Sequence, residues 1–137
     1  MLSDDRASYS LVMPKEQSTK LIAIVDDDES VQSALQDLIE ADGLRARSFG
    51  SAEGFLESGL QHKAACLITD IRMPGMSGLE LQAKLKADGC RIPIIFITAH
   101  GDARVRIQAM REGAVEFLMK PFDDQVLLSR VRAAVHS

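Results

Sequence analysis

The sequence predicts an α/β domain in which five parallel strands form a single sheet with helices packed on both of its faces. Two observations support this prediction. Short apolar runs, typical of strands that are buried on both faces, alternate with longer segments in which apolar residues recur every three or four positions. Strands that alternate with helices at this spacing form parallel sheets, and the 137 residues of the chain accommodate five such units in one domain.

Composition excludes several classes of function. The chain is 46% apolar and 26% charged, which is ordinary for a globular protein. A net charge of −4, no tryptophan and one tyrosine argue against nucleic-acid binding by this domain alone. No apolar run approaches the roughly 20 residues that span a bilayer, so we expect no membrane partner. Cys66 and Cys90 lack the spacing of metal ligands and are expected to be reduced thiols of a cytoplasmic protein.

The first half of the predicted domain contains two strands and two helices. Residues 1–19 are polar and predict a mobile N-terminal leader, so the domain is assigned to residues 20–137. The continuous apolar run at 21–25 predicts a buried strand, and the helix that follows ends at Gly43. The more polar segment 44–49 predicts an edge strand. Ser51 then caps a short helix to about Ser58. The apolar face of the first helix consists of Val31, Ala34, Leu35, Leu38 and Ile39.

The middle of the domain is organised around Asp70. The apolar run at 64–69 predicts a second buried strand, and Asp70 arrives as that strand ends. Pro74, Gly75 and Gly78 then break the chain into a loop, and the next helix continues to about Gly89. A carboxylate in this position is held by a rigid strand at the edge where open α/β sheets bind ligands.

The last third of the chain predicts two more units. Residues 94–98 form the fourth strand, and Asp102 caps a helix that continues to Glu112. Residues 115–119 form the fifth strand, which Lys120 and Pro121 end. Either Asp123 or Asp124 caps the final helix. The inner face of that helix is predicted to consist of Leu127, Val131, Ala134 and Val135.

Groups capable of chemistry are concentrated where the predicted strands end. We expect the flavodoxin-like strand order 2-1-3-4-5, which places a functional crevice between strands 1 and 3. Strand ends from distant parts of the chain meet only after folding, so the recurrence of such groups there is informative. They are Asp26 and Asp27 after the first strand, Asp70 after the third, Thr98 at the end of the fourth and Lys120 after the fifth.

The combination of these groups indicates phosphoryl transfer onto a carboxylate. Clustered carboxylates repel one another unless a cation lies among them, and Mg²⁺ is the hard cation that one or two carboxylates and phosphate oxygens bind. Lys120 adds a positive charge, and Thr98 adds a hydroxyl donor. The sequence contains no GxxxxGK loop that would hold a nucleotide. Asp70 is therefore the predicted nucleophile, accompanied by a metal and a charge clamp.

Four segments together resemble the receiver domain of two-component response regulators. They are residues 25–29 (Val-Asp-Asp-Asp-Glu), 69–78 (Thr-Asp-Ile-Arg-Met-Pro-Gly-Met-Ser-Gly), 95–101 (Ile-Phe-Ile-Thr-Ala-His-Gly) and 117–122 (Phe-Leu-Met-Lys-Pro-Phe). The resemblance covers about residues 20–136 and implies a CheY-like fold. Arg72, two residues after Asp70, and His100, two residues after Thr98, are most similar to FixJ-like receivers of the NarL/LuxR class.

The resemblance implies a role for each site residue. Asp70 would accept a phosphoryl group from a sensor histidine kinase. Asp27, Asp70 and the backbone carbonyl of Arg72 would bind Mg²⁺, and Asp26 would bind it through a water molecule. Thr98 would move toward the phosphoryl group and Lys120 would bind it. On this interpretation the chain is not an enzyme that acts on other substrates, since its chemistry is limited to its own phosphorylation and dephosphorylation.

The resemblance also implies a conformational switch. Phe117 occupies the position of an aromatic switch residue that acts together with Thr98, although phenylalanine lacks a hydroxyl. The peptide bond before Pro121 would be cis. The surface made by the helix over 103–112, the last strand and the last helix would bind a partner or form a phosphorylation-dependent homodimer. The arginines of that helix are interpreted either as a solvated face or as part of this output surface. They are Arg104, Arg106 and Arg111.

Several alternatives remain open at this stage. Asp28 could replace Asp27 as a metal ligand, although a charged first helical turn explains Asp28 equally well. Side-chain roles for His100 and Arg72 are undecided, as is the question of a stand-alone receiver or a piece of a longer regulator. The runner-up function is a haloacid-dehalogenase-type phosphatase with Asp26 as its nucleophile, which leaves the segment after Asp70 unexplained.

Overall fold

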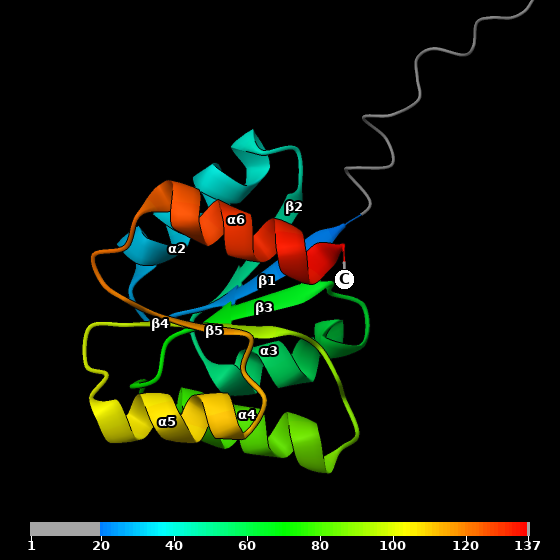
Figure 1. The fold of residues 1–137 in the computed structure, drawn as a ribbon. Helices are drawn as coiled ribbons and strands as arrows, with labels where there is room; N and C mark the ends of the chain where they lie inside the picture. The colour runs from blue at the N-terminus through cyan, green and yellow to red at the C-terminus, as the bar shows by residue number, and fades with distance from the viewer. Residues whose placement is uncertain (1–19, 137) are drawn as a thin grey trace, which may run out of the picture.

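A computed structural model describes residues 20–136 of the chain as one α/β domain (Figure 1). The predicted leader lies outside the described residues. The elements in order are β1 (Leu21–Val25), α2 (Glu29–Ala41), β2 (Arg45–Phe49), α3 (Ala52–Ser58), the 3₁₀ helix η2 (Leu60–His62), β3 (Cys66–Thr69), α4 (Gly78–Ala87), β4 (Ile94–Thr98), α5 (Ala103–Arg111), β5 (Glu116–Met119) and α6 (Asp124–Val135).

The five strands form one parallel sheet in the order β2-β1-β3-β4-β5, which confirms the predicted topology. Figure 1 shows α2 and α6 on one face of the sheet and α3, α4 and α5 on the other. The register pairs Val25 with Thr69 and Thr69 with Phe96. β1 and β3 therefore end level with one another, whereas β4 continues for two more residues to Thr98, which pairs with Met119 at the end of β5. Because the sheet is parallel, the residues that follow these strands emerge at the same edge of the sheet.

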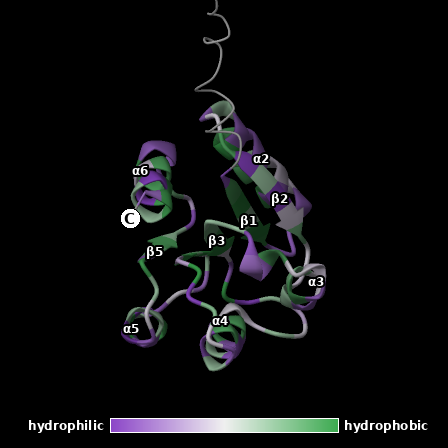
Figure 2. Cartoon of the chain, turned by 90° about the vertical axis from the view of Figure 1, so that its right-hand side faces the viewer, coloured by the Kyte–Doolittle hydropathy of each residue, from purple (hydrophilic) through white to green (hydrophobic). Residues whose placement is uncertain are grey.

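Two apolar cores lie on opposite faces of the sheet and explain the continuous apolar runs. In β1, Ala23 and Val25 pack toward α3 and α4, whereas Ile22 and Ile24 pack toward α2 and α6. β3 and β4 alternate in the same way. Burying each large aliphatic side chain contributes about 1.5–3 kcal/mol, so the central strands form a rigid frame for whatever follows them. Figure 2 shows the apolar colour concentrated on the central strands and the inner faces of the helices.

The structure confirms the predicted N-terminal caps of the helices and decides between the two candidates for the cap of α6. Ser51 accepts a hydrogen bond from the Gly54 N–H at 3.0 Å, and Asp102 accepts one from the Val105 N–H at 2.9 Å. Asp123, not Asp124, caps α6. A capping box between Ser77 and Glu80 begins α4 and was not predicted.

Strand boundaries are the main corrections to the predicted elements. β3 begins at Cys66 and not at residue 64, because the Ala64 N–H donates to the Leu60 carbonyl and closes η2. β2 begins one residue later than predicted, because the Leu44 N–H donates to Ile39 in α2. β5 likewise begins at residue 116 and α5 ends at residue 111. On α6 the predicted inner residues are buried, except that Ala134 is half-buried.

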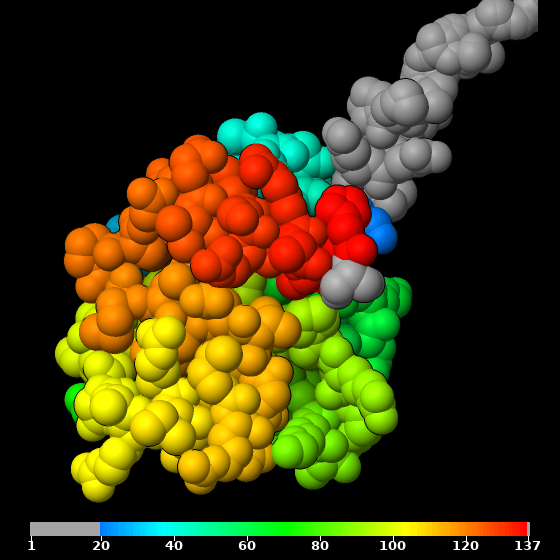
Figure 3. Space-filling view, in the orientation of Figure 1, coloured from blue at the N-terminus to red at the C-terminus, as the bar shows by residue number. Residues whose placement is uncertain are grey.

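None of the helices within residues 20–136 is long and apolar enough to cross a membrane. The space-filling view in Figure 3 shows α5, β5 and α6 meeting in one continuous surface. This is the surface that the sequence predicts as the output face.

The two thiols are predicted to differ in reactivity. Both cysteines are free, but Cys66 is buried in β3, and this burial raises the pKa of its thiol to about 12. Cys90 is half-buried, and its Sγ lies 3.3 Å from the Gln61 carbonyl. At pH 8, a disulfide reagent should modify Cys90 in the folded protein and leave Cys66 protonated and unmodified. Cys90→Ser should then show no reactive thiol until denaturant is added, and rapid modification of that folded variant would contradict the structure.

Candidate functional site

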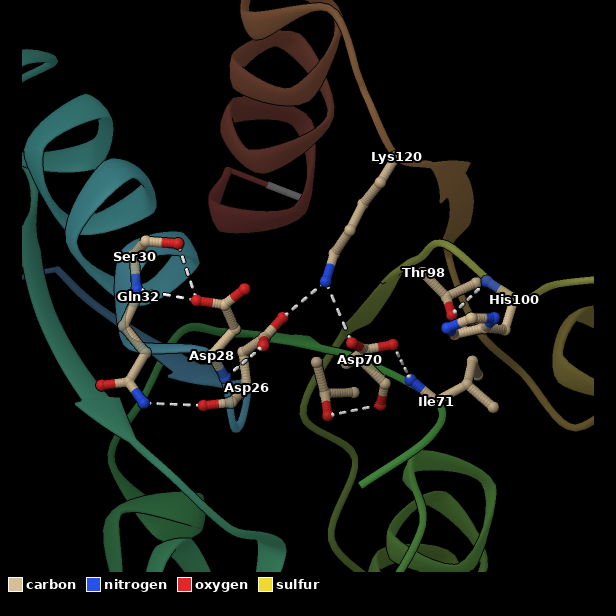
Figure 4. A network of polar contacts seen from close by, with 10 residues as sticks. Asp26, Asp28, Ser30, Gln32, Asp70, Ile71, Thr98, His100 and Lys120 are labelled. Atoms are coloured by element: carbon tan, nitrogen blue, oxygen red, sulfur yellow. Dashed lines mark hydrogen bonds and ion pairs between the residues drawn. The ribbon is translucent and has the colours of Figure 1, made fainter. Parts of the chain in front are cut away.

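The site lies where β1, β3 and β5 end (Figure 4). Asp26, Asp70 and Lys120 each follow a strand directly, and each still donates its backbone N–H to the sheet. Their hydrogen bonds to the carbonyls of Phe49, Val25 and Thr98 measure 3.0, 3.0 and 2.9 Å. The backbone of all three residues is therefore fixed by the sheet, while their side chains leave it and converge.

The Lys120 ammonium bridges the two carboxylates. Its Nζ lies 3.0 Å from Asp26 Oδ2 and 3.0 Å from Asp70 Oδ2. The carboxylate side chains are 3% and 8% exposed and that of Lys120 is 20% exposed, so the three charges are largely shielded from solvent. Charge-assisted contacts of this kind are strong where water is excluded.

The charges of the bridge are not balanced. Burial raises the pKa of the Asp26 carboxyl, and the hydrogen bonds from the Asp28 N–H and Lys120 offset only part of that effect. Burial alone would lower the pKa of Lys120, but the hydrogen bonds to Asp26 and Asp70 outweigh it and raise the pKa. Lys120 therefore stays protonated, whereas the ionised form of Asp26 is disfavoured. An additional cation would relieve this excess of negative charge.

The remaining oxygens orient the two carboxylates. Asp70 Oδ1 accepts the backbone N–H of Ile71 at 2.6 Å, and Asp26 Oδ1 accepts the N–H of Asp28 at 2.9 Å. Gln32 in α2 donates to the Asp26 carbonyl at 2.6 Å. Each carboxylate thus directs one oxygen to the backbone and the other, Oδ2, toward Lys120.

The residues present fit a divalent cation. Asp26, Asp27 and Asp70 each offer a carboxylate oxygen, and these oxygens lie within 4.8 Å of one another. Asp27 is exposed and makes no hydrogen bond or ion pair with the described part of the chain. Asp28 instead turns to α2, where its Oδ1 accepts the N–H and the hydroxyl of Ser30 at 2.9 and 2.6 Å. Oxygen ligands of this kind suit Mg²⁺, and Asp27 is the exposed carboxylate directed into the cluster.

The other predicted site residues surround this cluster. Figure 4 places Thr98 beside Asp70, on the side away from Asp26. Thr98 is fully buried, and its Oγ1 accepts the His100 N–H at 3.1 Å, which leaves the hydroxyl proton available to donate. The His100 side chain is exposed. Arg72 is exposed in the loop after β3, and the Lys120–Pro121 bond is cis, as the resemblance implies.

Phe117 is buried and lies against the turn that follows Thr98. A Cβ added to Gly101 would stand 2.4 Å from Phe117 Cζ and 3.0 Å from Thr98 Cγ2, so only glycine leaves room for the ring there. Arg106 in α5 lies over the same ring at 5.8 Å, and its Nη1 donates to the Phe117 carbonyl at 3.4 Å. Of the two interpretations of Arg106, a solvated face alone does not describe its surroundings, because its guanidinium covers the Phe117 ring.

Sequence reasoning missed the supporting contacts of Gln32, Ile71, Gly101 and Arg106. Ile71 acts through its backbone N–H, which carries no sequence signal. The glycine after His100 was a usable signal, because a loop glycine often marks a close approach.

Comparisons with known proteins place this chain in a family. The family model described as the response regulator receiver domain matches residues 22–132. The transcriptional regulatory protein FixJ of Azorhizobium caulinodans is 42% identical over 114 residues, which cover 83% of this chain and 54% of that protein. Nodulation protein W of Bradyrhizobium diazoefficiens is 48% identical over 120 residues, which cover 87% of this chain and 53% of that protein.

Solved structures agree with this result. The crystal structure of FixJ-N is 38% identical with a TM-score of 0.76, and the match covers 85% of this chain and 94% of that one. Full-length FixJ from B. japonicum is 34% identical with a TM-score of 0.79, and the match covers 87% and 59% of the two chains.

The chain therefore belongs to the receiver domain family of response regulators, and its role is that of a phosphoacceptor in two-component signalling. Within that family it is FixJ-like, and it spans about half the length of the curated relatives it matches. The predicted family and fold are confirmed, and the comparisons give no support to the phosphatase alternative.

The geometry of the acidic cluster predicts that Asp27, and not Asp28, is a metal ligand. Asp27→Asn should weaken Mg²⁺ binding at least about tenfold, because even indirect partners of a metal contribute that much. Asp28→Asn is the matched control, since an asparagine still caps α2 and lies outside the cluster. Amide NMR shifts followed during a Mg²⁺ titration measure both variants. Weaker binding by Asp28→Asn together with unchanged binding by Asp27→Asn would show that the ligand is Asp28.

Proposed function

We propose that Asp70 accepts the phosphoryl group of a histidine kinase, with Mg²⁺ bound beside it, and that the modification alters the surface of α5, β5 and α6. The observation that carries this proposal is the bridge in which Lys120 holds Asp26 and Asp70 together. Of the two carboxylates, Asp70 is the one that lies between the Lys120 ammonium and Thr98 (Figure 4).

The transfer is a substitution at phosphorus. Asp70 Oδ2 forms the new P–O bond, the P–N bond to the kinase histidine breaks, and its electron pair remains on the imidazole nitrogen. The Ile71 N–H holds Oδ1 at 2.6 Å, so Oδ2 is the oxygen available for attack. The Lys120 ammonium already lies 3.0 Å from that oxygen and can follow the phosphoryl oxygens as they gain charge.

Asp27, Asp70 and the carbonyl of Arg72 would hold Mg²⁺ directly, and Asp26 would hold it through water. When bound, the ion neutralises charge on the carboxylates and on the phosphoryl oxygens. The chain's chemistry is confined to the Asp70 carboxylate, which becomes an acyl phosphate that is later hydrolysed. The protein is therefore a switch and not an enzyme for external substrates. As in other signalling by histidine kinases, we place it in the cytoplasm.

The switch transmits the new charge through Thr98 and Phe117. The free hydroxyl proton of Thr98 would donate to the phosphoryl group, and the turn that contacts the Phe117 ring would move with it. Phe117 has no hydroxyl, so its response would be a change in burial alone. A ten- to hundredfold change in partner affinity requires only about 1.4–2.8 kcal/mol, which repacking one aromatic ring can supply.

The output surface fits a second copy of the chain. Exposed apolar side chains lie on α5, β5 and α6 and on the segment between α5 and β5. Ile107, the most exposed of them at 53%, stands among charged residues on α5. The relatives are about twice as long, and one of them, FixJ of Azorhizobium caulinodans, is named a transcriptional regulatory protein. We therefore propose that a longer regulator would use this dimer in transcription regulation while the domain itself does not bind nucleic acid. The surface side chains are Ile107, Met110, Val115, Met119 and Val126.

Acetyl phosphate with Mg²⁺ tests the site of modification. Borohydride reduction of the acyl phosphate converts the labelled aspartate to homoserine, and mass spectrometry locates it. We expect the label at Asp70, and Asp70→Asn should remain unlabelled. A label at Asp26, or rapid turnover of small phosphate esters, would instead support a phosphatase.

Sedimentation tests the dimer. With beryllofluoride and Mg²⁺ the chain should shift from monomer toward dimer, because the acyl-phosphate mimic alters the α5, β5 and α6 surface so that it binds a second copy. Ile107→Glu should abolish the shift without changing the labelling of Asp70. A chain that stays monomeric at high concentration with the mimic bound would reject the dimer and leave another partner as the output.

A further inference from the structure

The loop that follows Asp70 is held at both ends. Ile71 and Met73 are buried in the core, and the Gly78 N–H donates to the Ile71 carbonyl at 2.7 Å. A Cβ on Gly78 would stand 2.1 Å from the Asp70 carbonyl oxygen, so α4 begins directly against the backbone of the predicted acceptor. Between these points, however, Arg72, Pro74 and Gly75 are exposed and lack such packing.

The middle of the loop is held by a carboxylate from a different helix. Glu53 Oε2 in α3 accepts the Met76 N–H at 2.8 Å. A Cβ on Gly75 would stand 2.6 Å from the same oxygen, and Gly75 has a φ of +78° that favours glycine. The chain therefore runs directly against the Glu53 carboxylate.

Glu53 is well placed to hold the loop. Ser51 caps α3, and the neighbouring Ala52 and Phe55 side chains are fully buried, so the helix cannot rotate. Glu53 forms no other hydrogen bond or ion pair with the described part of the chain. Its carboxylate thus has one partner, the loop.

We infer that Glu53 is a positioning residue for the Mg²⁺-dependent phosphorylation of Asp70. It orders the segment from Arg72 to Met76 in advance, so that the Arg72 carbonyl is in place when the ion binds. The inference rests on the proposed function, because it assumes that this carbonyl is a ligand. Ordering a loop before binding removes an entropic cost from the binding step, and indirect partners of this kind change metal affinity about 10–100-fold.

Four single variants of the full chain separate this role from a general contribution to folding. Glu53→Asp keeps the charge but withdraws it from Met76, whereas Glu53→Gln loses the charge and keeps an oxygen that can accept the N–H. Glu53→Ala removes both. Glu57→Ala is the matched control, because Glu57 lies on the same helix, is exposed and has no polar contact with the described residues.

The measurements are Mg²⁺ affinity from amide NMR shifts and the initial rate of Asp70 phosphorylation by acetyl phosphate at increasing Mg²⁺. Glu53→Ala and Glu53→Asp should raise the Mg²⁺ concentration for half-maximal rate about tenfold, within the range for indirect metal partners. The rate at saturating Mg²⁺ should stay within about twofold of the parent chain, since the reacting groups are unchanged. Glu53→Gln and Glu57→Ala should behave like the parent chain.

Two results would overturn the inference. One is a lower melting temperature for Glu53→Ala with an unchanged Mg²⁺ requirement, which would make the contact structural only. The other is normal behaviour of Glu53→Asp together with loss in Glu53→Gln, which would mean that charge acts and not the hydrogen bond. Failure of the parent chain to become labelled at Asp70 is a different outcome, because it rejects the proposed function itself.

Discussion

The bridge from Lys120 to Asp26 and Asp70 is the constraint around which the domain is arranged. Its members are 94 and 50 residues apart in sequence, and only the strand order β2-β1-β3-β4-β5 brings them together. β4 lies between β3 and β5, so the lysine side chain reaches past the end of β4 to both carboxylates. Moving any of the three strands out of register would leave buried charge unpaired, which is costly.

The same bridge leaves the site able to bind a divalent cation and a phosphoryl group. Burial raises the pKa of the Asp26 carboxyl, and one ammonium among three carboxylates leaves an excess of negative charge that suits a divalent cation. A phosphoryl group would then compete with the carboxylates for Lys120. The sheet holds the backbone of Asp26, Asp70 and Lys120 in place. Any movement that accompanies binding of a phosphoryl group must therefore occur in side chains and in the turn beside Phe117, where the ring fits only against a glycine.

The sequence predicts the frame and the reacting groups well, because both are properties of single strands. Burial on both faces produces continuous apolar runs, and a polar residue directly after such a run, such as Asp70, is easily seen. Contacts between a side chain and the backbone of another element leave no such pattern. The hydrogen bond that the Met76 N–H donates to Glu53 is of this kind, and a bond from the Ala64 N–H to the Leu60 carbonyl likewise leaves no pattern in the sequence. The loop contact and the late start of β3 were therefore not predicted.

We propose that Asp70 Oδ2 accepts the phosphoryl group and that Lys120 leaves the bridge to bind it. A crystal structure of the chain with Mg²⁺ and beryllofluoride tests this most directly. We expect beryllium bonded to Asp70 Oδ2, Lys120 in contact with fluoride, and Mg²⁺ bound by Asp27 and the Arg72 carbonyl. Beryllofluoride on Asp26, or on Asp70 with Lys120 still bridging both carboxylates, would contradict it.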